Sequence, residues 1–168
     1  NEPMDFKPGE DYRYNNSGYF LLGAIIEKVS GKPYAQHMEE TFFKPLGLKD
    51  TCYGSHSRII PNRADGYKPD GDGFANADFI SMTQPHGAGA LLSTVTDLYK
   101  WTGALHSGKV VSEKSFTAMI TPTKLNDGKT RDYGYGLSLG KLFGEKVVAH
   151  GGGIHGFSTF GIKMPGKN

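Results

Sequence analysis

A polar stretch that begins at Tyr14 and leads into an apolar helix constrains the fold of this chain more than any other feature. Positions two apart in an extended loop point to the same side, so Tyr14 and Asn16 can face one cavity while Asn15 faces away. Asn16 or Ser17 is expected to cap the helix, and Gly31 to end it in a left-handed conformation. The helix is expected to anchor the loop through a buried stripe made of Leu22, Ile25, Ile26 and Val29.

Three further helices are predicted, over residues 33–41, 94–105 and 112–120, the last of them capped by Ser112. Thr94 and Asp97 have the spacing of a capping box at the start of the second of these helices. Beyond residue 133 the hydrophobic residues alternate with a period of two, which predicts strands rather than helices. The three predicted strands have short connections that favour antiparallel pairing, and they cover residues 133–139, 146–150 and 157–164.

The composition is that of a soluble globular protein, with 168 residues, 37% hydrophobic and 21% charged. The net charge of +2 is too small to indicate binding to nucleic acid, and no apolar run is long enough to span a membrane. Cys52 is the single cysteine and cannot form an internal disulfide. The six histidines lack the spacing of a zinc site, and the calcium-like start at Asp70 and Asp72 is followed by Phe74 at a ligand position. Neither a metal nor another cofactor is therefore expected.

A strand that runs into consecutive glycines is the second feature with chemical meaning, because Gly151, Gly152 and Gly153 follow directly on His150. A flexible glycine hairpin with a solvated histidine is the simplest alternative. The spacing of Gly151, Gly153 and Gly156 also fits a dinucleotide-binding fingerprint. That fingerprint needs a helix to follow and an acidic residue about 20 positions on. A strand-like run follows here instead, so dinucleotide binding is rejected.

A serine nucleophile inside the chain is a weaker alternative. Residues 150–153 fit the oxyanion motif of α/β-hydrolases, and residues 136–140, centred on Ser138, fit their nucleophile elbow. In that fold the glycine motif comes first and the elbow opens a helix, whereas here the order is reversed and residues 141–146 are too few for a helix. Lys141 stands three residues after Ser138, but residues three apart on a strand point to opposite faces. Ser138 is therefore interpreted as an ordinary strand residue.

Several runs of the chain resemble the serine β-lactamase and penicillin-binding-protein superfamily, most of all its branch of class C β-lactamases, esterases and D-aminopeptidases. The resemblance implies an α+β fold of the β-lactamase/transpeptidase-like type, an antiparallel sheet flanked by helices, which is incomplete in this chain. The chain is then part of a single β-lactamase-like domain, 1–168, with a helical part over about 14–120 and a sheet part over about 133–168. The runs that carry the resemblance are residues 7–10, 14–27, 42–48, 87–98 and 147–157.

Two of these runs match active-site motifs of the superfamily. Tyr14-x-Asn16 matches its Tyr-x-Asn motif, and His150-x-Gly152 matches the His-x-Gly form of the motif that reads Lys-Thr-Gly in many members. The backbone N–H of Gly153 would be one oxyanion-hole donor, and the glycines let an acyl group lie against the strand without meeting a Cβ. The resemblance implies Tyr14, Asn16 and His150 as catalytic residues, and Gly151, Gly152 and Gly153 as substrate-binding residues.

The mechanism implied by the resemblance is a covalent acyl-enzyme. A serine and a lysine of a Ser-x-x-Lys motif are expected upstream of Asn1, and the serine attacks the substrate carbonyl. Tyr14 would be the general base, assisted by the lysine and by His150 when that residue is protonated. Asn16 would hold the substrate amide or the lysine, and His150 would contact the leaving group or a substrate carboxylate.

The function implied is that of a fragment of a serine acyl-transfer hydrolase that acts on an amide, a β-lactam or an ester. Histidine in place of lysine is mostly neutral at pH 7, which makes a carboxylate-bearing β-lactam a less certain substrate and keeps esters and D-amino-acid peptides open. The fragment by itself is expected to be inactive, because it holds no credible nucleophile. A non-catalytic relative that only binds peptide or cell-wall ligands is the alternative from another class.

The expected partner is a small-molecule or peptide substrate, with no nucleic acid and no membrane span. Sheet edges that a missing segment leaves uncovered tend to recruit another chain, so self-association or pairing with that segment is also expected. The resemblance favours an extracytoplasmic location, periplasmic or secreted, and leaves a cytoplasmic one open.

Overall fold

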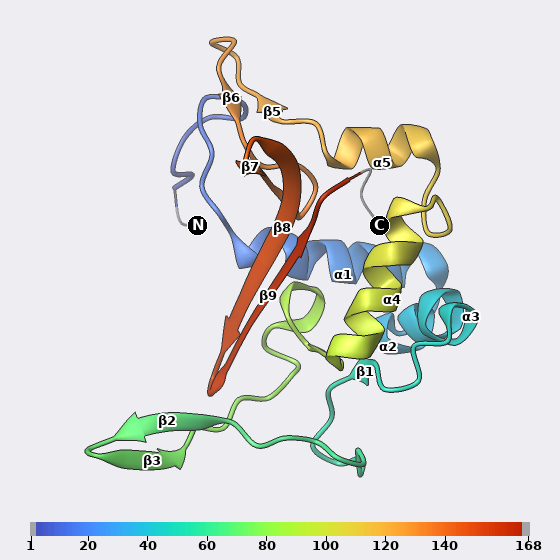
Figure 1. Ribbon diagram of the computed structural model, residues 1–168, viewed down its shortest axis with the longest axis vertical. Helices are drawn as coiled ribbons and strands as arrows, with labels where there is room; N and C mark the ends of the chain where they lie inside the picture. Colours follow the sequence, from blue (N-terminus) through green and yellow to red (C-terminus); the bar gives the residue numbers. More distant parts are fainter. Residues whose placement is uncertain (1–2, 166–168) are drawn as a thin grey trace. The chain divides into compact units, whose positions relative to one another are not determined.

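Helices and short antiparallel sheets together build the fold, which confirms the predicted α+β class (Figure 1). The computed structural model describes residues 3–165, so the last three residues of the predicted sheet part lie outside it. The described chain divides into two compact units. The first unit holds the chain up to Tyr14 together with residues 105–150 and the chain from Gly161 on, and the second unit holds residues 15–104 and 151–160. No helix among the described residues is both long and apolar enough to cross a membrane.

The second unit begins with helix α1, Asn16–Ser30, whose two ends are defined by local hydrogen bonds. Asn15, in an extended conformation, caps the helix because its side-chain oxygen accepts the Gly18 N–H at 3.1 Å. The predicted cap at Asn16 or Ser17 is therefore one or two residues too late, and Asn16 is already the first helical residue. Gly31 ends the helix in the left-handed conformation, with φ 67°, as predicted.

The face of α1 that packs inward is not the predicted apolar stripe. Gly23 is the buried residue of the helix, and a Cβ there would lie 2.7 Å from the His86 ring and 3.3 Å from Gly87. Residues three and four positions away from Gly23 share this face, among them Ile26, the only stripe residue that is partly covered. The expected burial of Leu22, Ile25 and Val29 is wrong, because these side chains are 48%, 54% and 82% exposed.

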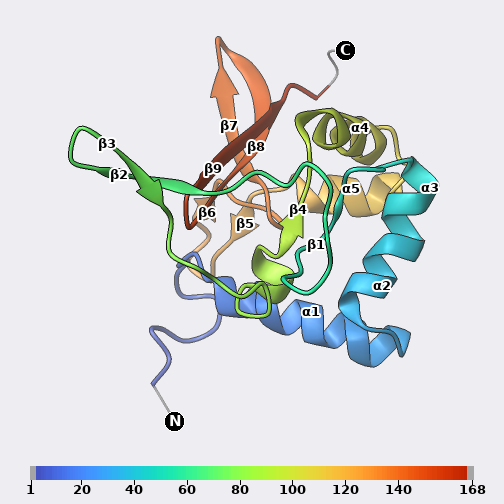
Figure 2. The ribbon, with the colours of Figure 1, turned by 90° about the horizontal axis from the view of Figure 1, so that it is seen from below.

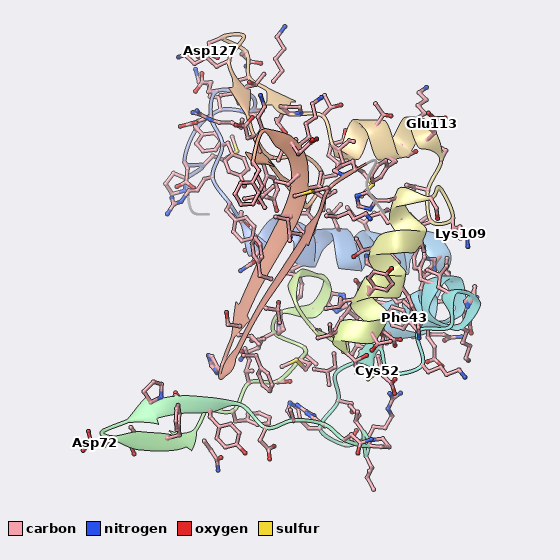
Figure 3. The ribbon with its side chains drawn as sticks, in the orientation of Figure 1. Phe43, Cys52, Asp72, Lys109, Glu113 and Asp127 are labelled. Atoms are coloured by element: carbon pink, nitrogen blue, oxygen red, sulfur yellow. The ribbon has the colours of Figure 1, made fainter. Side chains whose placement is uncertain are left out.

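After α1 the chain continues through one helical segment of changing pitch, which Figure 2 shows beside α1. It consists of α2, Tyr34–Met38, the π-helical turn η1, Glu39–Phe43, and α3, Lys44–Leu46. Pro33 precedes the first helical residue, and the Glu27 carboxylate accepts the Tyr34 N–H at 2.8 Å, so α1 and α2 are joined by a hydrogen bond. Phe43, labelled in Figure 3, is 4% exposed and belongs to the core.

A buried carboxylate organises the start of the next helix. Helix α4, Val95–His106, follows Thr94, whose hydroxyl accepts the Asp97 N–H at 3.3 Å, as the predicted capping pair requires. The Asp97 side chain is fully buried and accepts the Asp50 N–H at 2.8 Å, the Thr51 hydroxyl at 3.0 Å and the Lys100 ammonium at 2.9 Å. Burial acts to raise the pKa of the Asp97 carboxyl, but the hydrogen bonds from Lys100, Asp50 and Thr51 outweigh it and hold that pKa below its ordinary value.

Four short strands also belong to the second unit. Strand β1, Cys52–Tyr53, pairs antiparallel with β4, Leu91–Leu92, close to the 3-10 turn η2, His86–Ala88. Strands β2, Tyr67–Asp70, and β3, Gly73–Asn76, form an exposed antiparallel hairpin. Figure 3 shows Asp72 at the tip of this hairpin, so the calcium-like sequence is a solvated turn.

The first unit contains helix α5, Glu113–Met119, which Ser112 caps as predicted by accepting the Ser115 N–H at 3.2 Å. It is followed by a two-stranded hairpin that the sequence does not predict. Strands β5, Thr123–Lys124, and β6, Thr130–Arg131, are only two residues long each, too short to show a hydrophobic period. Figure 3 labels Asp127 at the turn between them.

The largest sheet has the strand order β7-β8-β9, with β7 at Ser138–Leu142, β8 at Glu145–Ile154 and β9 at Phe157–Lys163 (Figure 1). The register pairs Ser138 with Ala149 and Leu142 with Glu145 in an antiparallel hairpin, and Phe143 and Gly144 form its turn with positive φ. Because β7 leads into another strand and not into a helix, Ser138 is not at a nucleophile elbow, and the α/β-hydrolase alternative is excluded.

We expect Asp97→Asn to lower the free energy of unfolding of the intact protein by about 2 kcal/mol at pH 7, because a buried charged acceptor is lost. The depressed pKa sets the sign of the pH dependence. Stability from Asp97 is present above the ordinary aspartate pKa of about 3.9, and it disappears as the pH falls through the lower pKa of the folded state. Urea unfolding of both proteins between pH 7 and pH 3 should therefore show curves that converge in acid.

The matched control is Asp72→Asn at the exposed hairpin tip, which should leave the midpoint unchanged. A constant difference between Asp97→Asn and the wild-type protein down to pH 3 would contradict the assignment of the effect to the ionised carboxylate.

Candidate active site

Tyr14 and His150 lie close together in the first unit, although they are far apart in the sequence. Their ring centroids are 6.0 Å apart with an angle of 36° between the ring planes. Tyr14 is 52% exposed and His150 is half-buried, so a ligand can reach both side chains. The structure thus brings together two residues that the resemblance assigns to one active site, while their catalytic roles stay predictions.

Two tyrosines that the sequence analysis did not select complete this group. The Tyr133 hydroxyl and Nε2 of His150 are 2.8 Å apart, within hydrogen-bond distance. The Tyr133 ring lies edge-on to Tyr14 at 6.2 Å and is tilted against Tyr12 at 5.3 Å. We call these four residues, Tyr12, Tyr14, Tyr133 and His150, the tyrosine–histidine cluster. Tyr12 stands two residues before Tyr14, so the same-side rule for extended chain could have found it.

The segment that carries Tyr12 and Tyr14 is held against the β5–β6 hairpin at two points. Asn126 donates its backbone N–H to the Gly9 carbonyl at 2.8 Å and its side-chain amide to the Pro8 carbonyl at 3.1 Å. The Arg131 guanidinium donates to the Asp11 carboxylate at 2.6 Å. These contacts fix the backbone on the N-terminal side of the cluster.

The surroundings of Asp11 and Tyr12 favour an ionised carboxylate on the first residue and a neutral phenol on the second. The hydrogen bond from Arg131, followed by that from the Tyr12 N–H, holds the pKa of the Asp11 carboxyl below its ordinary value. Burial raises the pKa of the Tyr12 phenol, and the neighbouring Tyr14 adds to the effect. Tyr12 is thereby suited to pack against Tyr133 as a neutral ring.

Tyr133 is fixed by its own backbone. Its N–H donates to the Arg131 carbonyl at 2.7 Å, and its carbonyl accepts both the N–H of Thr123 at 3.1 Å and the hydroxyl of that residue at 2.7 Å. The next residue, Gly134, approaches the Met119 carbonyl so closely that a Cβ would collide with it. The main chain at Tyr133 is therefore anchored to β6, β5 and the end of α5.

The other predicted site residues belong to the second unit. Asn16 is the exposed first residue of α1. The glycines lie in β8 beyond Ala149, where the pairing with β7 ends. A Cβ on Gly152 would lie 3.0 Å from the Thr159 hydroxyl, whereas a Cβ on Gly153 would meet nothing within 4 Å. The roles of these four residues stay predictions.

A metal site, or a hollow able to hold a ligand, would be another candidate for a functional site in the described chain. Between residues 3 and 165 no group of three or more histidine, cysteine, aspartate or glutamate side chains is placed to hold a metal ion. An open hollow of about 500 Å³ lies on the first unit, beside α5. Its lining contains none of the predicted site residues and consists of Lys114, Thr117, Ala118, Thr121, Pro122, Thr123, Lys124 and Tyr135.

Comparison with known proteins gives one family and a consistent set of relatives. A sequence model of the family described as Beta-lactamase matches residues 1–168. Penicillin-binding protein 4* of Bacillus subtilis (strain 168) is 33% identical over 172 residues, which cover 94% of this chain and 38% of that protein.

Two solved structures show the same fold. The D-stereospecific amidohydrolase from Streptomyces sp. has a TM-score of 0.83 and 29% identity over 98% of this chain and 50% of its own. The octameric penicillin-binding protein homologue from Pyrococcus abyssi has a TM-score of 0.78 and 32% identity over 95% of this chain and 37% of its own. These likenesses confirm the predicted β-lactamase/transpeptidase-like fold, and the chain spans half or less of the length of each protein.

We expect Arg131→Gln to speed hydrogen exchange of the Tyr12 amide in the intact protein about threefold, because an exposed ion pair contributes a small but finite restraint. The Tyr12 N–H itself donates to the Asp11 carboxylate at 2.8 Å, so release of Asp11 should be felt there first. The control is Lys129→Gln, which removes the 2.8 Å pair with Asp127 in the turn of the same hairpin. Equal exchange rates in the two variants would show that Arg131 does not hold the segment.

Proposed function

Because the chain belongs to the Beta-lactamase family, we propose that the protein containing it is a serine hydrolase that transfers an acyl group through a covalent intermediate. The observation that carries this proposal is the position of Tyr14 beside the hydrogen-bonded pair of Tyr133 and His150. A phenol and an imidazole within one ligand width supply a proton acceptor and a polar contact to the same substrate.

The proposed reaction has two acyl-transfer steps. A serine outside these 168 residues attacks the carbonyl carbon of the substrate, and the proton of its hydroxyl passes to Tyr14. The bond between serine oxygen and carbonyl carbon forms, the bond to the leaving amine breaks, and Tyr14 returns the proton to that amine. Water then attacks the acyl carbonyl carbon and gives a proton to the same base. The bond between serine oxygen and carbonyl carbon breaks, the base returns the proton to the serine oxygen, and the acid is released.

A phenol holds its proton at neutral pH unless positive charge is near it, so Tyr14 needs a cation to act as a base. The superfamily pattern assigns that part to a lysine that accompanies the serine, with His150 as a second contributor when protonated. Asn16 would hold the substrate amide, and the Gly153 N–H would donate to the developing oxyanion. The open space at Gly153 supports the last role, because nothing in the described structure fills the position of a Cβ there.

The substrate class that we favour is an amide of a D-amino acid. His150 stands where many relatives in this superfamily carry a lysine, and a mostly neutral imidazole does not recognise a free carboxylate as strongly as a permanent ammonium does. The D-stereospecific amidohydrolase from Streptomyces sp. is among the structures most like this chain, and its name supports the same stereochemistry. A D-peptide, an ester and a β-lactam are the other substrates that the mechanism admits.

Tyr14→Phe in the intact protein is expected to lower kcat for a D-amino-acid amide by about 10²–10⁴-fold and to change KM little, because the phenol takes up a proton only in the chemical step. Steady-state kinetics measure both constants. The control is Tyr99→Phe on α4, where the side chain is 80% exposed and the loss of a hydroxyl should leave kcat unchanged.

An effect confined to KM would mean that Tyr14 only lines the binding site. Failure of the wild-type protein to turn over any amide, ester or β-lactam, with ligand binding retained, would favour the non-catalytic binding relative.

Residues 1–168 alone are expected to show no reaction with a serine-reactive phosphonate, while the longer protein that contains them should be labelled once per chain. Ser138 and Lys141 both lie in β7, three residues apart on a strand, so the lysine cannot assist the serine. Intact mass spectrometry reads the labelling directly. A stoichiometric label on Ser138 would overturn the assignment of the nucleophile to another segment.

The same sample tests self-association. Exposed apolar side chains on α1, Leu22, Ile25 and Val29, favour binding of another chain, and the similar protein from Pyrococcus abyssi is octameric. We propose that residues 1–168 associate with themselves or with the remaining segment. A purely monomeric native mass would contradict this proposal.

A further inference from the structure

Tyr133 makes a hydrogen bond whose consequence extends beyond the proposed roles of Tyr14 and His150. We propose that Tyr133 is a positioning residue that fixes the tautomer of the His150 imidazole, so that Nδ1 carries the proton and is the nitrogen offered to the substrate. The part of this inference that concerns the substrate rests on the proposed function. The part that concerns the tautomer rests on the geometry alone.

The contact itself involves one defined ring nitrogen. The Tyr133 hydroxyl lies 2.8 Å from Nε2 of His150, well within hydrogen-bond distance. A phenol is a stronger acid than a neutral imidazole N–H, and an imidazole nitrogen is a stronger base than a phenol oxygen. Tyr133 therefore donates and Nε2 accepts, which leaves the proton of the neutral ring on Nδ1.

Tyr133 is held in one position, so its hydroxyl can point steadily at Nε2 of His150. Two backbone hydrogen bonds, at 2.7 and 3.1 Å, and one from the Thr123 hydroxyl, at 2.7 Å, tie the main chain of Tyr133 to Arg131 and Thr123. The phenol ring is flanked by Tyr12 at 5.3 Å and by Tyr14 at 6.2 Å, in tilted and edge-on arrangements that favour a single ring position. A donor fixed at both its backbone and its ring loses little further entropy when it orients the imidazole.

The second ring nitrogen is the one left for a ligand. Across residues 3–165 no hydrogen bond to Nδ1 of His150 is found, and the residue is only half-buried. With the proton on Nδ1, the neutral imidazole is a hydrogen-bond donor at that atom. A lysine in this place would also donate, but it would bring a permanent positive charge. With Tyr133 beside it, His150 donates a hydrogen bond from Nδ1 as a lysine would, but without the positive charge of the lysine. Such a donor suits the neutral carbonyl or amide of an uncharged substrate.

The tautomer can be read without an activity assay. The intact protein, labelled with ¹⁵N-histidine, is studied by long-range ¹H–¹⁵N correlation NMR at a pH where the ring is neutral, and His150→Gln assigns the signal. The wild-type protein should show the Nδ1–H form, and Tyr133→Phe should shift His150 toward the Nε2–H form that free neutral histidine favours. Tyr135→Phe is the matched control, because the Tyr135 side chain is 67% exposed and its backbone N–H, which the substitution keeps, is bonded to Met119.

An Nε2–H form in the wild-type protein would overturn the proposal, and so would a Tyr133→Phe spectrum identical to it. Should Tyr133→Phe fail to fold, the wild-type spectrum alone decides. In kinetic assays Tyr133→Phe should lower kcat/KM for a D-amino-acid amide by about 10-fold, the scale of one hydrogen bond, while Tyr135→Phe leaves it unchanged. A changed tautomer with unchanged kcat/KM would overturn the link to the substrate, and a protein inactive on all amides with the Nδ1–H form intact would overturn the proposed function alone.

Discussion

The 2.8 Å hydrogen bond between Tyr133 and His150 joins the end of the β5–β6 hairpin to the middle of β8, two of the three segments on which the site depends. The third is the stretch before α1, which Asn126 and Arg131 hold. Contacts from Asn126 and Arg131 hold that stretch against the hairpin, and the rings of Tyr14, Tyr133 and His150 bring side chains of all three segments together. The geometry around Tyr14 therefore depends on the packing of several phenol rings and on few charged contacts.

What the sequence predicts well is what local chemistry decides. Gly31 ends α1 in a left-handed conformation and Ser112 caps α5, because each needs only neighbours within a few residues. The inward face of α1 is predicted wrongly because the hydrophobic pattern selects the large apolar side chains. The helix instead approaches the turn at His86 and Gly87 through Gly23, which has no side chain. A pattern of apolar residues cannot reveal that a close backbone approach is what buries a helix.

The candidate site divides in the same way. Tyr14 and His150 follow from motifs that resemble a known superfamily, and their proximity follows from that resemblance. Tyr12 and Tyr133 could not be selected from their own neighbours, because an isolated tyrosine in a loop or before a strand is common and its importance is decided by tertiary contacts. By the motif resemblance His150 stands where many members of the superfamily carry lysine, and the change replaces a fixed charge by a ring whose hydrogen bonding a neighbour can direct.

Gly153 has a consequence for how this protein can change over time. The strand there is extended and the space above the residue is empty, so folding by itself places no limit on the side chain. Gly134 is the opposite case, because a larger residue would collide with the Met119 carbonyl, and this segment could not pack against the end of α5. Two glycines of this chain are thus subject to different kinds of selection: Gly134 is required by the architecture, whereas Gly153 can be replaced unless a ligand occupies the space beside it.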